Sequence, residues 1–524
     1  MGESRTKNVI KNTGAGIGVR LLSILLNFVL KTVFIRVLGI QYTGVSSLFT
    51  DILTILSFAE LGIGSAITYA LYKPVAQNDK IQIAKLMNFY KKAYRYVALT
   101  IAVTGGALVP FLGLIVKDVP DIKESITLIY LLYLINTMVS YLLIYKSSIL
   151  VARQKKYVIS LIQGVSNVVK LLVESVLIVV YHQFIIYLII EIIFTITQNY
   201  IIGRLADREY FIDKNNKALV LEKAEKAKLF ADIRALAMYQ ISGVVVDGAD
   251  SVIISAFLET SLVGYISYYK LIFNQISRMV IQFFDAMNPS VGNLAVTDTE
   301  DKQYQLFKST NFAIFWLMCV SCTGLAVCVN PLIKLWLGEE FILSENIVMV
   351  LTADFFVTNM IRVVAVFRTA NGLFVNGKYR PVIMAILNII LSVIMVKSLG
   401  VFGVLLATVV SRAVTQMWYD PWLVYSRVFS KKDADCRVME YYVAYIEYLL
   451  TIVTSIILAK LVTWESINRI LRLDNPLVQL IVAVMVSIIV SNVVFLLLWG
   501  RNDNCRYIME KFKHILKKWR GKKL

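Results

Sequence analysis

Charged residues, proline and histidine are all scarce in this chain of 524 residues. Only 17% of the residues are Asp, Glu, Lys or Arg, whereas 58% are hydrophobic, and the chain has 8 prolines and 2 histidines. A soluble protein has about 25% charged residues and close to half apolar ones. With only His182 and His514, no Ser-His-Asp arrangement, zinc-ligand run or nucleotide-phosphate loop can be assembled. We therefore expect no enzyme, no bound metal and no cofactor.

Stretches of apolar residues long enough to cross a membrane recur along the whole chain. A helix of about 20 residues spans a hydrocarbon core of about 30 Å, and helices satisfy their own backbone hydrogen bonds inside the bilayer. The sequence therefore predicts an all-α integral membrane protein with about 14 transmembrane helices. The expected spans are residues 13–38, 43–72, 93–116, 126–150, 157–181, 184–206, 235–258, 262–294, 307–330, 346–370, 378–397, 400–424, 441–463 and 476–499.

Lys and Arg residues gather in every second connection between these spans. The Lys155-Lys156 pair, the 204–234 connection and the tail after Arg501 are strongly basic, whereas the intervening turns have few positive charges. Because basic loops stay on the cytoplasmic side, we expect a cell-membrane protein with both termini in the cytoplasm. The net charge of +19 suits membrane lipids as partners and gives no support to nucleic-acid binding.

Two stretches of the first half recur in the second half at nearly the same spacing. Gly44 aligns with Gly264, an offset of 220 residues, and Tyr157 aligns with Tyr379, an offset of 222 residues. About six helices separate equivalent positions, so the two halves share one orientation and are related by an axis along the membrane normal. We expect two pseudo-symmetric six-helix lobes plus two C-terminal helices. The expected parts are an N-lobe at 1–206, a cytoplasmic basic linker at 207–234, a C-lobe at 235–424, helices 13 and 14 at 425–499, and a basic amphipathic tail at 500–524.

Three segments carry a resemblance to a known family: "VFIRVLGIQYTGVSSLF" near the start, "LVARQKKY" after the fourth span and "PLIKLWLGEEF" after the ninth. The chain resembles the Wzx-type polysaccharide flippases, which handle O-antigen and capsule repeat units and belong to the multidrug/oligosaccharidyl-lipid/polysaccharide exporter superfamily. The resemblance implies a flippase that moves an undecaprenyl-diphosphate-linked oligosaccharide from the inner to the outer leaflet by alternating access. A polysaccharide polymerase is then an expected partner. Lipid II and teichoic-acid precursors stay open as cargo, because residue spacing does not identify the sugar.

Charge is costly inside a bilayer, so ionisable residues within the spans are the first candidates for function. Two polar stripes occur, each on one side of its helix. The stripe on the first helix consists of Arg20, Asn27 and Lys31, and the stripe on the eighth consists of Lys270, Asn274 and Arg278 together with Asp285. We predict that the stripes bind the diphosphate, since both helices resemble cavity-lining helices of the superfamily. The alternative is that Arg20, Lys31 and Lys270 extend to the membrane interface.

Acidic residues inside the spans have two possible uses. Asp51, Asp247 and Asp250 are candidates for binding a coupling proton or sodium ion. In the alternative, Asp247 or Asp250 pairs with the cations of the polar stripes until substrate displaces it. Lys170 and Glu174, four residues apart on the fifth helix, are expected to form an internal ion pair.

Two other functions compete with the flippase. A drug or cation antiporter of the same superfamily would favour an acidic cavity without a cationic stripe on the first helix. A membrane polysaccharide polymerase or glycosyltransferase would need a large loop or domain for its catalytic groups, but the expected outer connections have only a few to about fifteen residues. The sequence therefore favours the flippase.

Overall fold

The computed structural model describes most of the chain. The described residues are 26–60, 63–116, 121–153, 155–209, 220–297, 300–371, 373, 377, 379–429, 434–467, 475–507 and 510. Within helices, some residues, including Asp247 and residues 282–297, are described by their backbone alone. No strand occurs in these ranges, and nearly all of their residues are helical. The prediction of an all-α protein is confirmed.

Eight helical segments of the described ranges are long and apolar enough to cross a membrane. The longest, Arg380–Val428, has 49 residues. At about 1.5 Å per residue it would measure about 70 Å, more than twice the thickness of a hydrocarbon core. It contains a kink at Gly400, where φ is 57°, a left-handed conformation that glycine adopts readily. The kink falls where the sequence predicts a turn between the spans 378–397 and 400–424. The chain is thus a multi-pass membrane protein.

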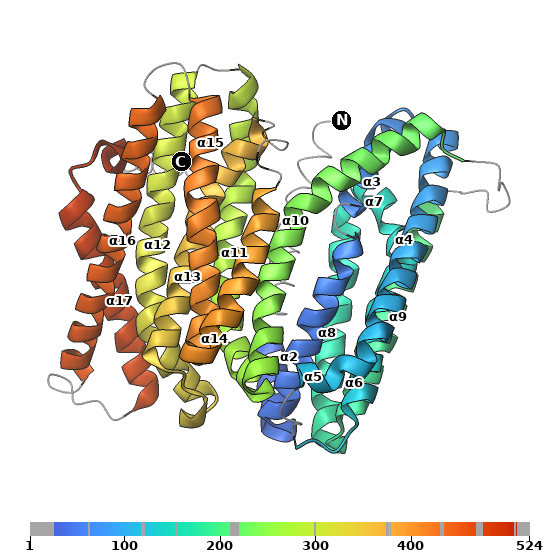
Figure 1. Ribbon diagram of the computed structural model, residues 1–524, viewed down its shortest axis with the longest axis horizontal. Helices are drawn as coiled ribbons and strands as arrows, with labels where there is room; N and C mark the ends of the chain where they lie inside the picture. The colour runs from blue at the N-terminus through green and yellow to red at the C-terminus, as the bar shows by residue number, and fades with distance from the viewer. Residues whose placement is uncertain are drawn as a thin grey trace, which may run out of the picture. The chain divides into compact units, whose positions relative to one another are not determined.

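The chain divides into two compact units, residues Met1–Gly264 and Tyr265–Leu524. The first unit contains helical residues 26–38, α2 (Ile40–Leu56), η1 (Ser57–Glu60), α3 (Ile63–Ala76), α4 (Lys80–Leu108), η2 (Val109–Phe111), α5 (Leu112–Ile115), α6 (Ile126–Ile144), α7 (Ser147–Ala152), α8 (Lys156–Tyr181), α9 (Phe184–Glu209), α10 (Lys223–Phe257) and the first turn of α11 (Thr260–Thr297) (Figure 1).

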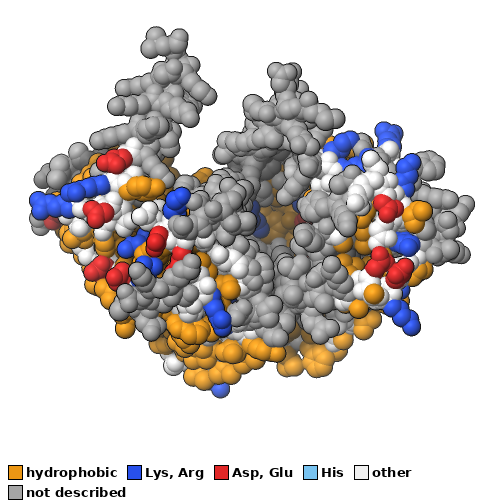
Figure 2. Space-filling model, turned by 90° about the horizontal axis from the view of Figure 1, so that it is seen from above, with side chains coloured by type: hydrophobic (Ala, Val, Ile, Leu, Met, Phe, Trp, Pro, Cys, Tyr) orange, Lys and Arg blue, Asp and Glu red, His pale blue; other side chains and the backbone are white. Residues whose placement is uncertain are grey.

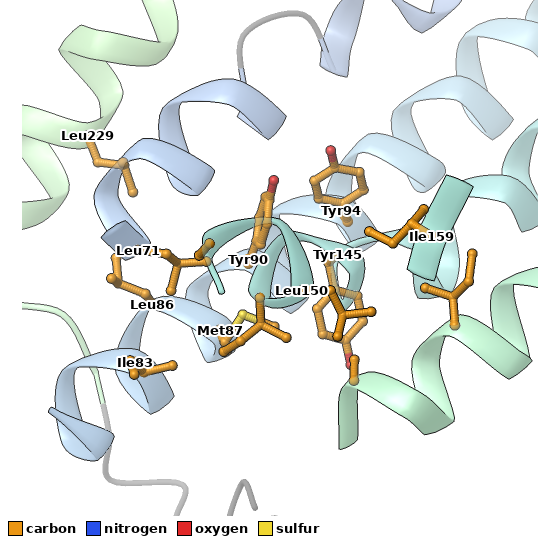
Figure 3. Close-up of a cluster of buried hydrophobic side chains, with 14 of the residues drawn as sticks. Leu71, Ile83, Leu86, Met87, Tyr90, Tyr94, Tyr145, Leu150, Ile159 and Leu229 are labelled. Atoms are coloured by element: carbon orange, nitrogen blue, oxygen red, sulfur yellow. The ribbon is translucent and has the colours of Figure 1, made fainter. Parts of the chain in front are cut away.

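Helices of the first unit pack in a series, α4 against α6, α6 against α9 and α9 against α8. The long helix α10 packs against α2 and α3. At the end where α4 begins, a buried cluster joins α3, α4, α7 and the start of α10 (Figure 3). Tyr90 and Tyr94 of α4 lie in this cluster with Leu71, Leu150 and Leu229. The cluster therefore fixes the first part of α10 to the unit.

The second expected span, 43–72, is interrupted by the 3-10 turn Ser57–Glu60 between α2 and α3. Helix α4 supplies hydroxyl groups at this interruption. Tyr94 donates a hydrogen bond to the Glu60 carboxylate at 2.7 Å, and Tyr90 donates one to the Gly64 carbonyl at 3.0 Å. Backbone groups released by a helix break need such partners inside a membrane. Hydropathy did not predict the break, because the donors come from another helix.

The second unit is built around one central helix, α12 (Glu300–Trp336), which packs against α13, α16 and α17. Aromatic rings fill the contacts of α12 with α16 and α17. Phe315 stacks on Tyr448 of α16 with ring centroids 3.8 Å apart, and it meets Trp499 of α17 edge to face at 5.4 Å. The other elements of this unit are the rest of α11, η3 (Glu339–Phe341), α13 (Glu345–Ala370), α14 (Arg380–Arg412), the π-helical turn η4 (Ala413–Met417), α15 (Trp418–Val428), α16 (Ala434–Glu465) and α17 (Pro476–Trp499).

The two glycines aligned by the sequence repeat lie against each other in the first unit. A Cβ atom added to Gly44 of α2 would lie 2.3 Å from the Thr260 carbonyl oxygen, and one added to Gly264 would lie 3.0 Å from the Gly44 nitrogen. Such an approach of two backbones is possible only without side chains, and small residues serve this purpose between membrane helices. The contact fixes the start of α11 on α2.

We therefore predict that Gly44→Ala lowers the stability of the protein by about 1–3 kcal/mol, because the methyl group must displace backbone rather than a flexible side chain. The measurement is the midpoint of thermal unfolding in detergent. Gly106→Ala is the matched control, since Gly106 is helical and no atom lies within 4 Å of its added Cβ. Equal midpoints for the two variants would contradict the prediction.

Candidate functional site

The predicted site residues lie on helices of both units. In the first unit, Asn27 and Lys31 belong to helical residues 26–38, Asp51 to α2, and Asp247 and Asp250 to α10. In the second unit, Lys270, Asn274 and Arg278 lie on α11. Arg20 lies outside the described residues, as does the side chain of Asp247.

Lys31 is half-buried beside an aromatic group. Its Nζ atom lies 5.6 Å from the centroid of the Phe34 ring. Phe34 in turn meets Phe184 and Tyr187 of α9 edge to face, at 5.6 and 5.4 Å. A cation over an aromatic face is attracted by the ring quadrupole. Lys31 is therefore directed toward α9 rather than left at a helix end.

Three further charged residues interact electrostatically with Lys31, namely Lys170 and Glu174 of α8 and Glu191 of α9. Lys170 Nζ lies 2.5 Å from Glu191 Oε1, and each of these side chains is 21% exposed. The expected pair of Lys170 with Glu174 is replaced by this contact between neighbouring helices. We call Lys31, Lys170, Glu174 and Glu191 the charged tetrad.

Glu174 is the least satisfied member of the charged tetrad. It is fully buried, and neither carboxylate oxygen has a hydrogen-bond partner among the described residues. An ionised carboxylate is expensive to bury without donors. Fully ionised, the tetrad has two positive and two negative charges, so its sum is zero. The net charge of the tetrad would therefore change in either of two events. Glu174 could take up a proton, or Lys31 could pair with an anion from outside the tetrad.

Helices α2 and α10, which bear the predicted acids, pack against each other. The Ser251 hydroxyl donates a hydrogen bond to the Asp51 carboxylate. One turn away, Gly248 lies close to α2, because a Cβ added there would be 2.7 Å from Ile55. Asp250 is 2% exposed. All three predicted ion-coupling residues thus belong to this pair of helices.

The cations of α11 occupy a single face of that helix. Lys270 is half-buried, whereas Asn274 and Arg278 are exposed. Arg278 lies at the middle of the helix and makes no ion pair with any residue in the described ranges. The neighbouring Ser277 instead accepts a hydrogen bond from Asn359 Nδ2 of α13 at 3.0 Å. The packed side of α11 is therefore distinct from the side with Arg278.

One ion pair of the second unit was not predicted from the sequence. Arg412 Nη1 of α14 lies 2.5 Å from Asp354 Oδ1 of α13 and also contacts Thr358. The π-helical turn η4 follows Arg412 directly, and such turns are frequent at functional sites. Because 58 residues separate the partners, no local spacing could have indicated the pair.

Asp420 of α15 forms a second ion-pair centre in this unit. Its carboxylate is fully buried, 2.9 Å from Arg368 Nη1 and 3.1 Å from Arg380 Nε. The three residues join α13, α14 and α15 close to one end of each helix. Since both cations share one acid and the acid is fully covered, we interpret this group as structural.

No protein-family model matches the chain, and no curated protein matches it either. Solved structures do match. The chain is similar to lipid II flippase MurJ in an inward closed conformation, with a TM-score of 0.61 and 18% identity over 93% of this chain and 99% of that one.

Two MATE transporters have a similar fold. An inward-facing multidrug resistance MATE family transporter of the MOP superfamily gives a TM-score of 0.60 at 12% identity, covering 81% of this chain and 98% of that one. A mutant of the Vibrio cholerae MATE transporter VcmN gives 0.53 at 12% identity, covering 82% and 99%. At these identities the comparisons show a shared fold.

For the charged tetrad, we predict that Glu191→Gln and Glu174→Gln have unequal effects on stability. Glu191→Gln removes the partner of Lys170 and should cost about 1–3 kcal/mol, below the value for fully buried pairs because both side chains keep some exposure. Glu174→Gln removes a carboxylate that has no described donor, so it should cost less or raise stability. Thermal unfolding of the two purified variants makes the comparison, and a larger loss for Glu174→Gln would refute it.

Proposed function

We propose that this protein is a flippase that moves an undecaprenyl-diphosphate-linked oligosaccharide from the inner to the outer leaflet by alternating access, with both termini in the cytoplasm. The observation that carries the proposal is Arg278, an exposed arginine at the middle of α11, the helix of the predicted span 262–294, without an ion pair in the described ranges. An arginine in a span is expected to face a water-filled cavity or a ligand rather than lipid. The fold shared with a lipid II flippase supports the proposal.

The cargo chemistry explains why cations are needed. A diphosphate carries two or more negative charges, and leaving them unpaired in a medium of low dielectric would cost many kcal/mol. The guanidinium of Arg278 can hold two phosphate oxygens at once, whereas Lys31 and Lys270 offer single point charges. Asn27 and Asn274 lie on the same helices and would donate to phosphate or sugar oxygens. We propose Arg20 as a further phosphate ligand because it belongs to the polar stripe of the first helix in the sequence.

A drug or cation antiporter is the second candidate, because MATE transporters have a similar fold. The fold does not separate the two functions, but the charges favour the flippase. A cavity for cationic drugs would be acidic, whereas Lys31 and the α11 face bring positive charge. A membrane polymerase or glycosyltransferase is disfavoured by the short connections, such as residues 182–183 between α8 and α9.

We propose that transport is coupled to a proton or sodium gradient. The first candidates are Asp51 of α2 and Asp247 and Asp250 of α10, two helices that pack against each other. The charged tetrad offers a second route. If Lys31 pairs with the diphosphate, Lys170, Glu174 and Glu191 remain with a net charge of −1. Uptake of a proton at Glu174 would bring this charge to zero.

For substrate binding, Arg278→Ala should reduce transport at least about tenfold, since removing one charge-assisted bidentate contact costs more than 1.4 kcal/mol. Arg278→Lys should recover part of the activity, because lysine keeps the charge but loses the fork. Lys31→Ala should have a similar effect to Arg278→Ala. The measurement is translocation of a fluorescent lipid-linked oligosaccharide in proteoliposomes, beside complementation of a flippase-null strain.

Lys397→Ala is the control for lost positive charge, because Lys397 is exposed on α14, three residues before the kink at Gly400, and has no ion pair in the described ranges. Wild-type rates for Arg278→Ala and Lys31→Ala, alone and together, would reject the cationic substrate site. Uptake of cationic drugs by the wild-type protein would favour the antiporter instead.

For coupling, Asp51→Asn, Asp247→Asn or Asp250→Asn should abolish the dependence of transport on an imposed ion gradient while binding of lipid-linked sugar persists. Glu174→Gln should do so if the tetrad is the coupling site. The rate is measured with and without a proton or sodium gradient across the vesicle. Asp301→Asn is the control, as its side chain is 83% exposed. Unchanged gradient dependence in all four single variants and in the Asp51/Asp250 double variant would assign these acids to charge pairing.

A further inference from the structure

A cavity of about 450 Å³ lies in the first unit between α4 and the start of α10. Its polar lining includes Lys85, Asn88 and Lys92 of α4 and Lys226 of α10, and its apolar lining includes Tyr96 and Phe230. The cavity is separate from the charged tetrad and from the contact of α2 with α10. No role proposed above uses its lysines.

Specific contacts build the walls of this cavity. Gln82 Nε2 of α4 donates a hydrogen bond to Glu225 Oε1 of α10 at 2.7 Å, and Glu225 also completes the N-terminal cap of α10 with Glu222. Phe89 meets Phe230 edge to face with centroids 5.7 Å apart. Together with the buried cluster of Figure 3, these contacts hold the two helices around a preformed space.

The charge inside the cavity is positive and uncompensated. Lys85 and Lys92 are seven residues apart, so they lie on one side of α4, and Lys226 faces them from α10. None of the three lysines makes an ion pair with a residue in the described part of the chain. The nearby carboxylate of Glu225 is already bound to Gln82 and to the helix cap. An anion would therefore find three free ammonium groups.

The lysines lie toward the start of α4, and exposed apolar side chains follow along the helix. Figure 2 views the molecule from the end at which α10 begins, where Lys and Arg side chains lie among Asp and Glu side chains. Further along α4, the side chains of Tyr96, Leu99 and Val103 are 70%, 58% and 63% exposed. The rise from Lys92 to Val103 is about 16 Å, close to the thickness of one leaflet of hydrocarbon. A ligand bound here would contact the lysines at one end and the exposed apolar face of α4 along the rest of its length.

We propose that this cavity binds the phosphate headgroup of an anionic membrane phospholipid, whose acyl chain lies along the exposed face of α4. Positive charge recognises the phosphate, and the length of the apolar face matches one chain. The bound lipid would join α4 to α10, the helix that also bears Asp247 and Asp250. The proposal is independent of the cargo of the transporter.

The test uses the full-length protein in neutral detergent and native mass spectrometry, with phosphatidylglycerol or phosphatidylethanolamine as the added lipid. The variant Lys92→Gln/Lys226→Gln removes two of the three cavity cations. It should weaken phosphatidylglycerol binding at least about tenfold, since each lysine near a membrane surface contributes about 1 kcal/mol to the attraction of an anionic lipid. Lys92→Arg/Lys226→Arg should keep the binding and shows that the site tolerates substitution.

The matched control is Lys91→Gln/Lys223→Gln, which removes one lysine from each of the same two helices without touching the cavity lining. Its affinity for phosphatidylglycerol should stay within about twofold of the wild type. An equal loss in both double variants would mean that only the general surface charge attracts lipid, which would overturn the proposal. Competition by inorganic phosphate at similar concentrations, or lysine-dependent binding of a polyprenyl diphosphate but not of phosphatidylglycerol, would overturn it as well.

Discussion

Charged side chains inside a membrane protein need partners within the protein, because hydrocarbon supplies none. This requirement determines how the helices of both units are joined. Lys170 and Glu191 join α8 to α9, and Arg412 and Asp354 join α13 to α14. Each pair connects neighbouring helices, so it restricts their rotation and sliding more than a pair within one helix would. The apolar surfaces then pack around contacts that admit a single register.

The ionisable residues that are outside these ion pairs are the ones that indicate function. Glu174 is fully buried without a described donor, and Arg278 is exposed without a described ion pair. Neither arrangement stabilises the fold at rest, since the first is expensive to ionise and the second has no counterion. Natural proteins retain such groups where a ligand or proton completes them. A binding role accounts for both residues at once, whereas a purely structural role accounts for neither.

Hydropathy predicted the helical, multi-pass character of the fold, because it depends on the bilayer rather than on side-chain partners. The orientation expected from the basic loops and the two lobes expected from the repeat stay predictions. The contact of Gly44 with Gly264 joins two positions that the repeat had already aligned. The sequence did not predict the break at Ser57–Glu60, whose hydrogen-bond donors lie on α4. It also paired Lys170 with Glu174, since spacing along one helix is visible in a sequence and the approach of α9 is not. Partners distant in sequence require the tertiary structure.

Helix α10 takes part in both the cationic cavity and the contact with α2, so a movement at one of these places would affect the other. Its first turns close a cationic cavity against α4, and its later turns bring Ser251 to Asp51 of α2. A helix is stiff along its axis, so a shift of its start relative to α4 must be taken up at the contact with α2 or at a bend between them. The buried Leu229 and the contact of Phe230 with Phe89 oppose such a shift. A phosphate bound at the cavity lysines would oppose it further, and in this way the lipid composition of the membrane would act on the acids that we propose for coupling.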